Sequence, residues 1–588
     1  MKDLIIYYLT NISIYKGISL LLLNDYLLMI SFTSFLVYVI SMLLTKERGL
    51  TIKLKLLIIS IVIINLFNST INIFLINALL FFVNLIILWL IRHYFIALFA
   101  LKPDLVAPKK TKEEQETQQP ELKDQQSLLI RLPVYLLLFN IIIYILIYIT
   151  SLLFYSNLHI LNYNLVSYNL LLIILILLFS LFIYKVSKIE FKTDKTNKVQ
   201  LSLFLFIVLG VINIIISNNL FSIFSWFISS ATFLGLLFFL DNFSKENALI
   251  RPIFRLIDIS TMIFILIIFM IVILVGNNRI NSLNISNLIS LQNNFITCFL
   301  IFGFALLGSI IPFSLKNLKI FFQDNSITGL LLYSIILYST SFFIFRLGFA
   351  LVSPPLIIVV ILFTFSIVTV CLSSLYLCLE LFSSYEGFNH SIKTIFGYYL
   401  IIDFNMGLML LSFSIYIPDI EYNSYMSNLL FLIVIIKLIT LFIIYLFLPL
   451  ISKFEDDFHL IGPFYFKYKF YNLFFIIPGI VMIFLIGSPY IYYILLLFTK
   501  NPINSSFILS VNLTIILAIF IVLIVVFLMI ISTIYITLFS HRKKVYIKQL
   551  SEYRLSSVDL FLIITLISII GLASIIYLLY SQTFSFLF

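Results

Sequence analysis

The residues of this sequence that could do chemistry are charged side chains inside long apolar segments. Lys437 lies in the middle of FLIVIIKLITLFII, and Asp403 lies in IIDFNMG. A charge at the centre of a bilayer costs about 2.5–3.5 kcal/mol on insertion scales, so each such residue calls for a functional reason. A buried lysine can release its proton near neutral pH because burial disfavours its charged form. The sequence therefore indicates a buried proton relay through Lys437 and Asp403, and the alternative is a purely structural placement.

Three more charged residues that border apolar segments are candidates for the same relay. They are Lys500, Asp258 and Lys393. For Lys393, the alternative is a position at the end of a loop. For Arg346 and Glu380, near the ends of apolar segments, we expect placement at the membrane surface with the charged head in water. The pattern predicts relay residues and no catalytic residue.

Prolines inside apolar segments predict broken helices. Pro312 follows Gly308 and Ser309, while Pro478 and Pro489 interrupt a single long apolar run. Each proline removes a helical hydrogen-bond donor and clashes with the preceding turn. Broken helices at membrane depth are tolerated where neighbouring protein or a wet cavity satisfies the backbone. The two breaks therefore indicate a path for an ion or a substrate, and the alternative is that they are packing kinks.

Helices that cross a membrane must position these residues. Of the 588 residues, 62% are hydrophobic and only 10% are charged, whereas a globular chain carries about 25% charged residues. Runs such as 171–179 and 515–531 are continuously apolar, which favours helices over a barrel. The sequence predicts roughly fifteen to seventeen spans. We place them near residues 6–23, 26–44, 54–68, 72–99, 133–155, 165–186, 201–218, 220–240, 256–275, 295–312, 327–345, 353–376, 393–417, 427–451, 470–498, 508–538 and 557–580.

One long hydrophilic segment, Lys102–Gln126, interrupts this pattern. It is rich in Lys, Glu and Gln and offers too little apolar area to fold by itself, so we expect a flexible loop. The predicted organisation is N-terminal transmembrane helices in 1–100, the hydrophilic loop in 101–127, linking helices in 128–200, a core in 201–545 and a C-terminal helix in 546–588.

Charge and cysteine usage exclude several classes of protein. The net charge of +11 comes from Lys and Arg mostly between the spans, which is typical of membrane topology signals and not of nucleic-acid binding. The three cysteines lie in apolar segments without CxxC spacing, so no metal, iron–sulfur or disulfide site is predicted. No Gly-rich phosphate loop is present, so we expect no cofactor in this chain. Abundant Phe, Ile, Asn and Lys suggest an AT-rich organellar genome.

Three segments, at residues 303–349, 390–411 and 454–500, carry a resemblance to a known family. The matching residues, in chain order, are Pro312, Phe313, Asp324, Arg346, Ile392, Lys393, Tyr398, Met406, Gly407, Asp457, Gly462, Gly487, Pro489 and Lys500. In their order and spacing these segments resemble the antiporter-like membrane subunits of respiratory complex I, the NADH:ubiquinone oxidoreductase. The resemblance covers roughly residues 201–545, and by length and layout the sequence is most similar to subunit 2.

The resemblance implies an all-α polytopic membrane protein. It would contain an antiporter-like bundle of about 14 core transmembrane helices with broken helices, plus extra N-terminal helices. It also implies a membrane-arm subunit of the mitochondrial inner membrane that contributes to proton translocation coupled to quinone reduction. The redox chemistry would then reside in partner subunits. The implied partners are other membrane-arm subunits and membrane lipids such as cardiolipin, with no nucleic acid.

The sequence departs from the family at the positions that carry protons. Where the family has a Glu just after a Trp, Phe227 follows Trp226, and the positions of two family lysines fall at Leu307 and near Leu337. An apolar residue can neither accept a proton nor shift the pKa of a neighbour through its charge. Either the relay candidates have replaced these residues, or the proton channel is degenerate and the subunit is structural.

Alternative functions stay open at this point. A stand-alone ion or solute transporter uses similar broken helices, and subunits 4 and 5 of complex I share the resemblance. A subunit of cytochrome oxidase would need clustered histidines, whereas the five here are scattered. An ATP synthase subunit usually needs a mid-membrane Arg, which we do not find.

Overall fold

The computed structural model describes residues 26–37, 52–70, 73–101, 120–154, 158–160, 163–165, 167–190, 197–241, 261–262, 265–266, 327–348, 356–382 and 392–416. The chain divides into two compact units. The first consists of Met1–Leu307 with Leu331–Val352, and the second of Gly308–Leu330 with Ser353–Phe588.

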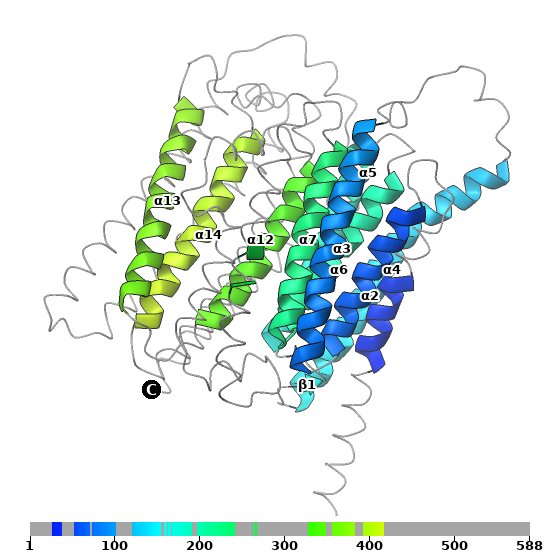
Figure 1. Ribbon diagram of the computed structural model, residues 1–588, viewed down its shortest axis with the longest axis horizontal. Helices are drawn as coiled ribbons and strands as arrows, with labels where there is room; N and C mark the ends of the chain where they lie inside the picture. Colours follow the sequence, from blue (N-terminus) through cyan, green and yellow to red (C-terminus); the bar gives the residue numbers. More distant parts are fainter. Residues whose placement is uncertain are drawn as a thin grey trace, which may run out of the picture. The chain divides into compact units, whose positions relative to one another are not determined.

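Long helices make up almost all of the described part of the first unit (Figure 1). After a helix at residues 26–37 come α2 (Ile52–Thr70), α3 (Phe74–Leu101), α4 (Pro120–Phe154), α5 (Ser167–Glu190), α6 (Asn197–Ile216), α7 (Leu220–Asp241) and α12 (Ile327–Gly348), whose first residues belong to the second unit. The predicted spans at 54–68, 72–99, 201–218, 220–240 and 327–345 agree with α2, α3, α6, α7 and α12 to within a few residues. Their continuous apolar sequences leave the backbone to pair within the helix, as lipid requires.

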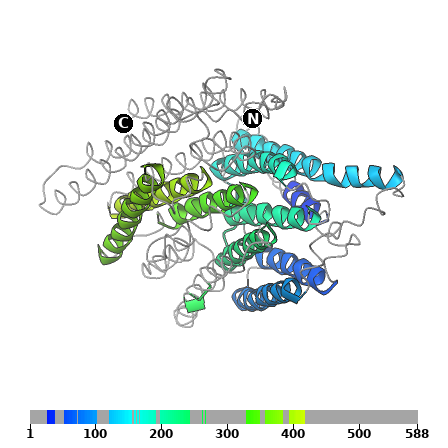
Figure 2. The same ribbon diagram turned by 90° about the horizontal axis from the view of Figure 1, so that it is seen from above.

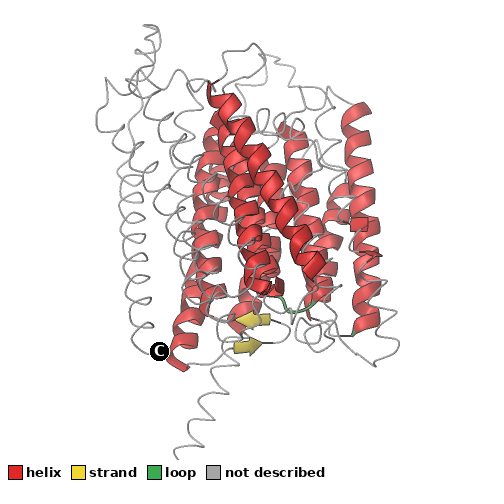
Figure 3. Ribbon diagram, turned by 90° about the vertical axis from the view of Figure 1, so that its left-hand side faces the viewer, coloured by secondary structure: helices red, strands yellow, loops and turns green. Residues whose placement is uncertain are grey.

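A short hairpin joins α4 to α5 (Figure 3). Strand β1 (Leu158–Ile160) pairs antiparallel with β2 (Tyr163–Leu165), so that Leu158 lies opposite Leu165 and Ile160 opposite Tyr163. The sequence predicts a helix near 165–186, and α5 begins two residues later because Leu165 pairs in β2. Backbone groups in a connection also need partners, and the strand pair supplies them.

Helix α4 begins earlier than the sequence predicts. Its first residue is Pro120, inside the segment Lys102–Gln126 that the sequence predicts as a loop, and the helix continues through Pro133, where the predicted span starts. Proline is favourable at the first helical position, and the Glu, Lys and Gln residues that follow have high helix propensity. Hydrophilic composition in this stretch therefore did not exclude a helix, while residues 102–119 lie outside the described residues.

Helix α7 is the central helix of the first unit. Its apolar span Leu220–Leu237 is 100% buried, whereas only 28% of the span Leu75–Tyr94 of α3 is buried. α7 packs against α2, α3 and α6, and Figure 2 shows α2 and α3 side by side in blue. The Phe81 ring of α3 lies 6.1 Å from Phe221 and 6.3 Å from Phe224, measured between ring centroids. Aromatic contacts thus hold the outer helix α3 on the central one.

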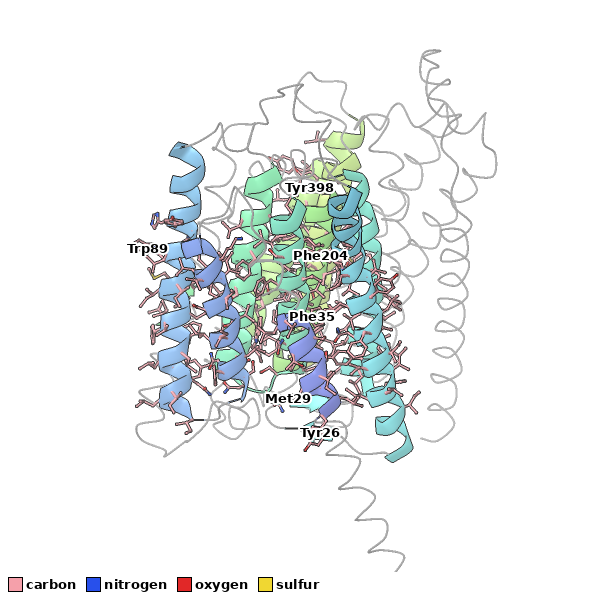
Figure 4. The ribbon with its side chains drawn as sticks, turned by 90° about the vertical axis from the view of Figure 1, so that its right-hand side faces the viewer. Tyr26, Met29, Phe35, Trp89, Phe204 and Tyr398 are labelled. Carbon is pink, nitrogen blue, oxygen red and sulfur yellow. The ribbon has the colours of Figure 1, made fainter. Side chains whose placement is uncertain are left out.

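The outward face of α3 is apolar, whereas the interior of the unit combines apolar packing with buried polar groups. Trp89 of α3 points away from the bundle and Phe204 of α6 lies inside it (Figure 4). Buried hydroxyls are mostly paired inside their own helix: Ser180 donates to the Ile176 carbonyl at 2.7 Å and Thr232 to the Ile228 carbonyl at 2.7 Å. This local pairing lets hydroxyl residues lie in apolar spans.

The described part of the second unit is a pair of packed helices, α13 (Leu356–Phe382) and α14 (Ile392–Tyr416). The sequence places these helices at 353–376 and 393–417, close to their observed bounds. The rings of Tyr376 and Tyr398 stack at 6.0 Å with an interplanar angle of 21° and join the two helices. Across the described residues, α3, α4, α7 and α13 are long and apolar enough to cross a membrane.

Candidate functional site

Asp403 is a buried carboxyl group near the middle of α14. Only 3% of its surface is exposed, and Asn405 on the same helix is fully buried. Ile392–Tyr416 is 25 residues long and Asp403 is its twelfth residue, so the carboxyl lies about 17 Å along the axis from the first residue. A group at that position is far from both ends of the helix. Asp403 therefore has the burial and the depth that a membrane proton carrier needs.

The other relay candidates are not brought to Asp403 in the described part of the chain. Lys393 is the second residue of α14, ten residues before Asp403, which corresponds to about 15 Å along the helix axis. Lys437, Lys500 and Asp258 lie outside the described residues. The predicted breaks at Pro312, Pro478 and Pro489 also lie outside them. The relay and the broken helices therefore stay predictions.

The apolar residues at the family's proton-carrying positions are buried where the structure describes them. Phe227 of α7 is 0% exposed and Leu337 of α12 is 2% exposed, while Leu307 lies outside the described residues. Phe227 and Leu337 thus lie in the protein interior, and neither side chain can carry a proton.

Sequence reasoning missed a buried polar region, which we call the asparagine–serine cluster. It consists of Asn65, Asn68 and Ser69 of α2, Asn84 of α3, and Ser222, Ser225 and Ser229 of α7. All seven side chains are at most 1% exposed. On α2, Asn68 and Ser69 follow Asn65 by three and four residues, and on α7, Ser225 and Ser229 follow Ser222 by three and seven residues, so each set lies on one face of its helix. That spacing is the sequence signal that a search for charges overlooks.

Side-chain hydrogen bonds across three helices connect the cluster. Asn65 Nδ2 donates to Ser229 Oγ at 2.9 Å, and Asn84 Nδ2 donates to the same oxygen at 3.3 Å. Asn68 Nδ2 donates to Ser225 Oγ at 2.9 Å. These bonds link α2 and α3 to α7 without any charged side chain.

Ser69 occupies the end of the cluster nearest the end of α2. Its Oγ donates to the Asn65 carbonyl at 2.9 Å and lies 2.7 Å from Ser222 Oγ. The indole Nε1 of Trp226 donates to the same Ser69 oxygen at 3.1 Å. Since the Ser69 proton goes to the carbonyl, Ser222 is the donor in the hydroxyl pair.

A second uncharged region, which we call the Asn140 cluster, consists of Ser31, Ser34 and Asn140. Ser31 Oγ donates to Asn140 Oδ1 at 2.5 Å, and Asn140 Nδ2 donates to Ser34 Oγ at 3.1 Å and to the Leu136 carbonyl at 2.8 Å. Both ends of this amide are therefore paired within the protein, as is usual for a buried polar group.

No family model and no curated protein matches the sequence. The fold, however, is similar to that of chains in two solved complexes. One is a chain of the membrane-bound sulfane sulfur reductase, an archaeal respiratory membrane complex, with a TM-score of 0.56 and 16% identity over 83% of this chain and 94% of that one. Another is a chain of the Mrp complex from Dietzia sp. DQ12-45-1b, with a TM-score of 0.51 and 11% identity over 72% of this chain and 77% of that one.

The fold is that of an all-α, polytopic membrane bundle. The described residues are almost entirely helical, four of the helices are long and apolar enough to cross a membrane, and each similar chain is matched over most of its length. At these identities the likeness concerns the fold alone. The sequence-based fold class is therefore confirmed for this membrane protein, while its function rests on further argument.

Proposed function

We propose that this membrane protein is an antiporter-like subunit in the membrane arm of a multi-subunit respiratory complex, where it contributes to proton translocation. Its fold is shared with a chain of a respiratory membrane complex and with a chain of the Mrp complex. The resemblance over residues 201–545 supports a finer assignment to the NADH:ubiquinone oxidoreductase of the mitochondrial inner membrane. In that assignment the protein is organelle-encoded, binds no redox cofactor and couples to quinone reduction in partner subunits.

The observation that carries the proposal is the buried carboxyl of Asp403. A carboxyl is a group that can bind and release a proton, and Asp403 places one near the middle of a buried helix. We propose Lys437 as that partner, with Lys500, Asp258 and Lys393 as further relay groups. Phe227 and Leu337 cannot titrate, so we propose that Asp403 takes part in proton transfer in their place.

Native gel electrophoresis tests the assignment to a complex. The full-length chain, carrying an epitope tag and extracted in a mild detergent, should migrate with NADH:ubiquinone reductase activity and far above its own mass of 68.4 kDa. An unrelated inner-membrane transporter with the same tag is the control for non-specific co-migration. Migration of the chain as a single small particle would favour a stand-alone transporter and contradict the proposal. Co-migration with a different respiratory activity would keep the coarser proposal and reject NADH:ubiquinone reductase.

A further inference from the structure

The asparagine–serine cluster contains three amide oxygens that accept no hydrogen bond from the part of the chain that the structure describes. They are Oδ1 of Asn65, Asn68 and Asn84. Each side chain is 0% exposed, and each Nδ2 donates to a serine hydroxyl oxygen. An amide oxygen has two lone pairs, and burying it without a donor is costly. Three such oxygens on neighbouring helices point to a ligand that donates hydrogen bonds.

Exchanging the oxygen and nitrogen of the amides does not remove this need. Ser229 Oγ donates its single proton to the Ser225 carbonyl at 2.6 Å, so it accepts from both Asn65 and Asn84. If either amide were turned around, its oxygen would face an acceptor, and its NH2 group would lose the serine acceptor instead. Asn65 and Asn84 are thus better as they stand. Asn68 Nδ2 also donates to the Phe221 carbonyl at 3.3 Å, which an oxygen in its place could not do. All three oxygens therefore still require donors.

The cluster extends from the ends of the helices to the middle of the apolar spans. Ser69 is one residue before the end of α2, and Ser222 is two residues after the start of α7. At the other end, Asn84 lies at the centre of the span Leu75–Tyr94 and Ser229 at the centre of Leu220–Leu237. The seven residue steps from Ser222 to Ser229 cover about 10 Å along α7. The positions of Asn84 in α3 and Ser229 in α7 therefore both indicate that the polar groups reach half-way through the membrane.

We propose that the asparagine–serine cluster binds a short chain of water molecules that donate hydrogen bonds to the three amide oxygens and lead from the helix ends to mid-membrane. Buried waters typically bridge several polar groups that the protein leaves unpaired, and this cluster offers amide oxygens and hydroxyls at successive turns. A metal cation fits less well, because every side chain of the cluster is uncharged and would leave the cation's charge unbalanced. The inference does not depend on the proposed respiratory function, since it concerns hydration alone.

Cysteine accessibility tests the proposal in the full chain in native membranes, after replacement of its three cysteines by alanine. Ser222→Cys, Ser225→Cys and Ser229→Cys are made singly and treated with 2-aminoethyl methanethiosulfonate, which reacts with the water-exposed thiolate. The matched control is Ser180→Cys, a fully buried serine near the middle of α5 whose hydroxyl is paired within its own helix. We expect at least tenfold faster modification at all three cluster positions than at 180, in the order 222, 225, 229. Rates at 225 and 229 as slow as at 180 would overturn the proposal.

Two further measurements test whether the amide oxygens are the groups that bind the water molecules. Asn68→Leu, added to Ser229→Cys, should slow its modification at least tenfold and leave Ser222→Cys unchanged; an unchanged rate at 229 would reject the amide oxygens as the site. When Na⁺ replaces choline as the cation of the buffer, the modification rates of the cysteine variants should not change. If Na⁺ slows modification in a saturable way, the cluster binds a cation and not a chain of water molecules.

Radiolytic labelling of the unsubstituted chain in ¹⁸O water avoids variants that fail to fold. Trp226 is 1% exposed but donates to Ser69, so bound water should label it, whereas Phe206, stacked at 5.1 Å on Phe233 between ring centroids, should stay unlabelled. Absence of label at Trp226 would count against the water chain.

Discussion

Asp403 and the asparagine–serine cluster are both buried and both reach mid-helix depth, yet only Asp403 carries a group that can change its charge. Asp403 carries a carboxyl group near the middle of α14, in the second unit. The cluster in the first unit consists of amides and hydroxyls, which do not titrate near neutral pH. A carboxyl can hold a proton, whereas neutral polar groups with water can only pass one on. The two regions are therefore suited to different steps of proton transfer.

The comparison also shows two ways in which a membrane protein can tolerate polar groups in its interior. A buried carboxyl needs hydrogen-bond donors or an opposite charge beside it. A buried amide needs a donor for its oxygen and an acceptor for its nitrogen. The Asn140 cluster provides both within the protein, while the asparagine–serine cluster leaves three oxygens for a ligand.

The largest effect is expected from removal of the only group of the two regions that titrates. Asp403→Asn keeps the shape of the side chain but cannot release a proton. We expect proton translocation by the assembled complex to fall about tenfold or more, while assembly on a native gel is unchanged. Proton uptake by inverted membrane vesicles, measured with a pH-sensitive dye during substrate oxidation, gives the rate.

Asp403→Glu is the control for this prediction, because it restores a carboxyl at the same depth and should recover much of the rate. Full proton translocation by Asp403→Asn would show that Asp403 is only a structural residue. It would leave the water chain in the first unit untouched.

A smaller effect, on stability, distinguishes the two uncharged clusters. Asn140→Leu removes three hydrogen bonds within the protein, whereas Asn65→Leu removes the single bond to Ser229 and an oxygen without a protein partner. At about 0.6 kcal/mol for an average membrane hydrogen bond, we expect Asn140→Leu to cost about 1–2 kcal/mol and Asn65→Leu less than about 1 kcal/mol. Thermal unfolding of the purified protein in detergent measures both. Equal losses would show that Asn65 is as fully paired as Asn140.

The sequence predicted the described helices and drew attention to Asp403, which is buried, but it missed the asparagine–serine cluster, for physical reasons. Continuous apolar runs define helices such as α7 and α14 directly, because lipid leaves few alternatives to a helix. Asp403 was found because a charge in an apolar run is conspicuous. Asn65 and Ser229 were missed because amides and hydroxyls occur in many helices, and only their hydrogen bonds across helices reveal that they form one cluster.

The ends of elements were harder to predict than their centres. Pro120 begins α4 and Leu165 pairs in β2, both against the hydropathy pattern. Hydropathy indicates which part of a helix lies in lipid, but it does not indicate how far the helix continues into water. Capping, propensity and local strand pairing decide those ends.

A comparably small effect on stability concerns the close packing of α6 on α7 next to the asparagine–serine cluster. A Cβ atom at Gly210 would lie 2.0 Å from Ser230 Oγ and 3.4 Å from a ring carbon of Trp226, whose indole donates to Ser69. Ser230 Oγ is buried and forms no hydrogen bond with the described residues, so its hydroxyl can turn away without losing one. Gly210→Ala should therefore cost only about 1 kcal/mol of unfolding free energy, through the altered Ser230 rotamer.

Ser230→Ala removes the hydroxyl that the new methyl group meets, so the double variant Gly210→Ala/Ser230→Ala should recover most of the loss. Thermal unfolding in detergent of the two single variants and the double variant forms a mutant cycle that isolates this contact. If the double variant is no more stable than Gly210→Ala alone, the steric conflict lies with the Trp226 ring. In that case a displaced Trp226 loses its hydrogen bond to Ser69, at the end of the cluster nearest the helix ends. Gly210→Ala should then also change the rate of thiol modification of Ser222→Cys.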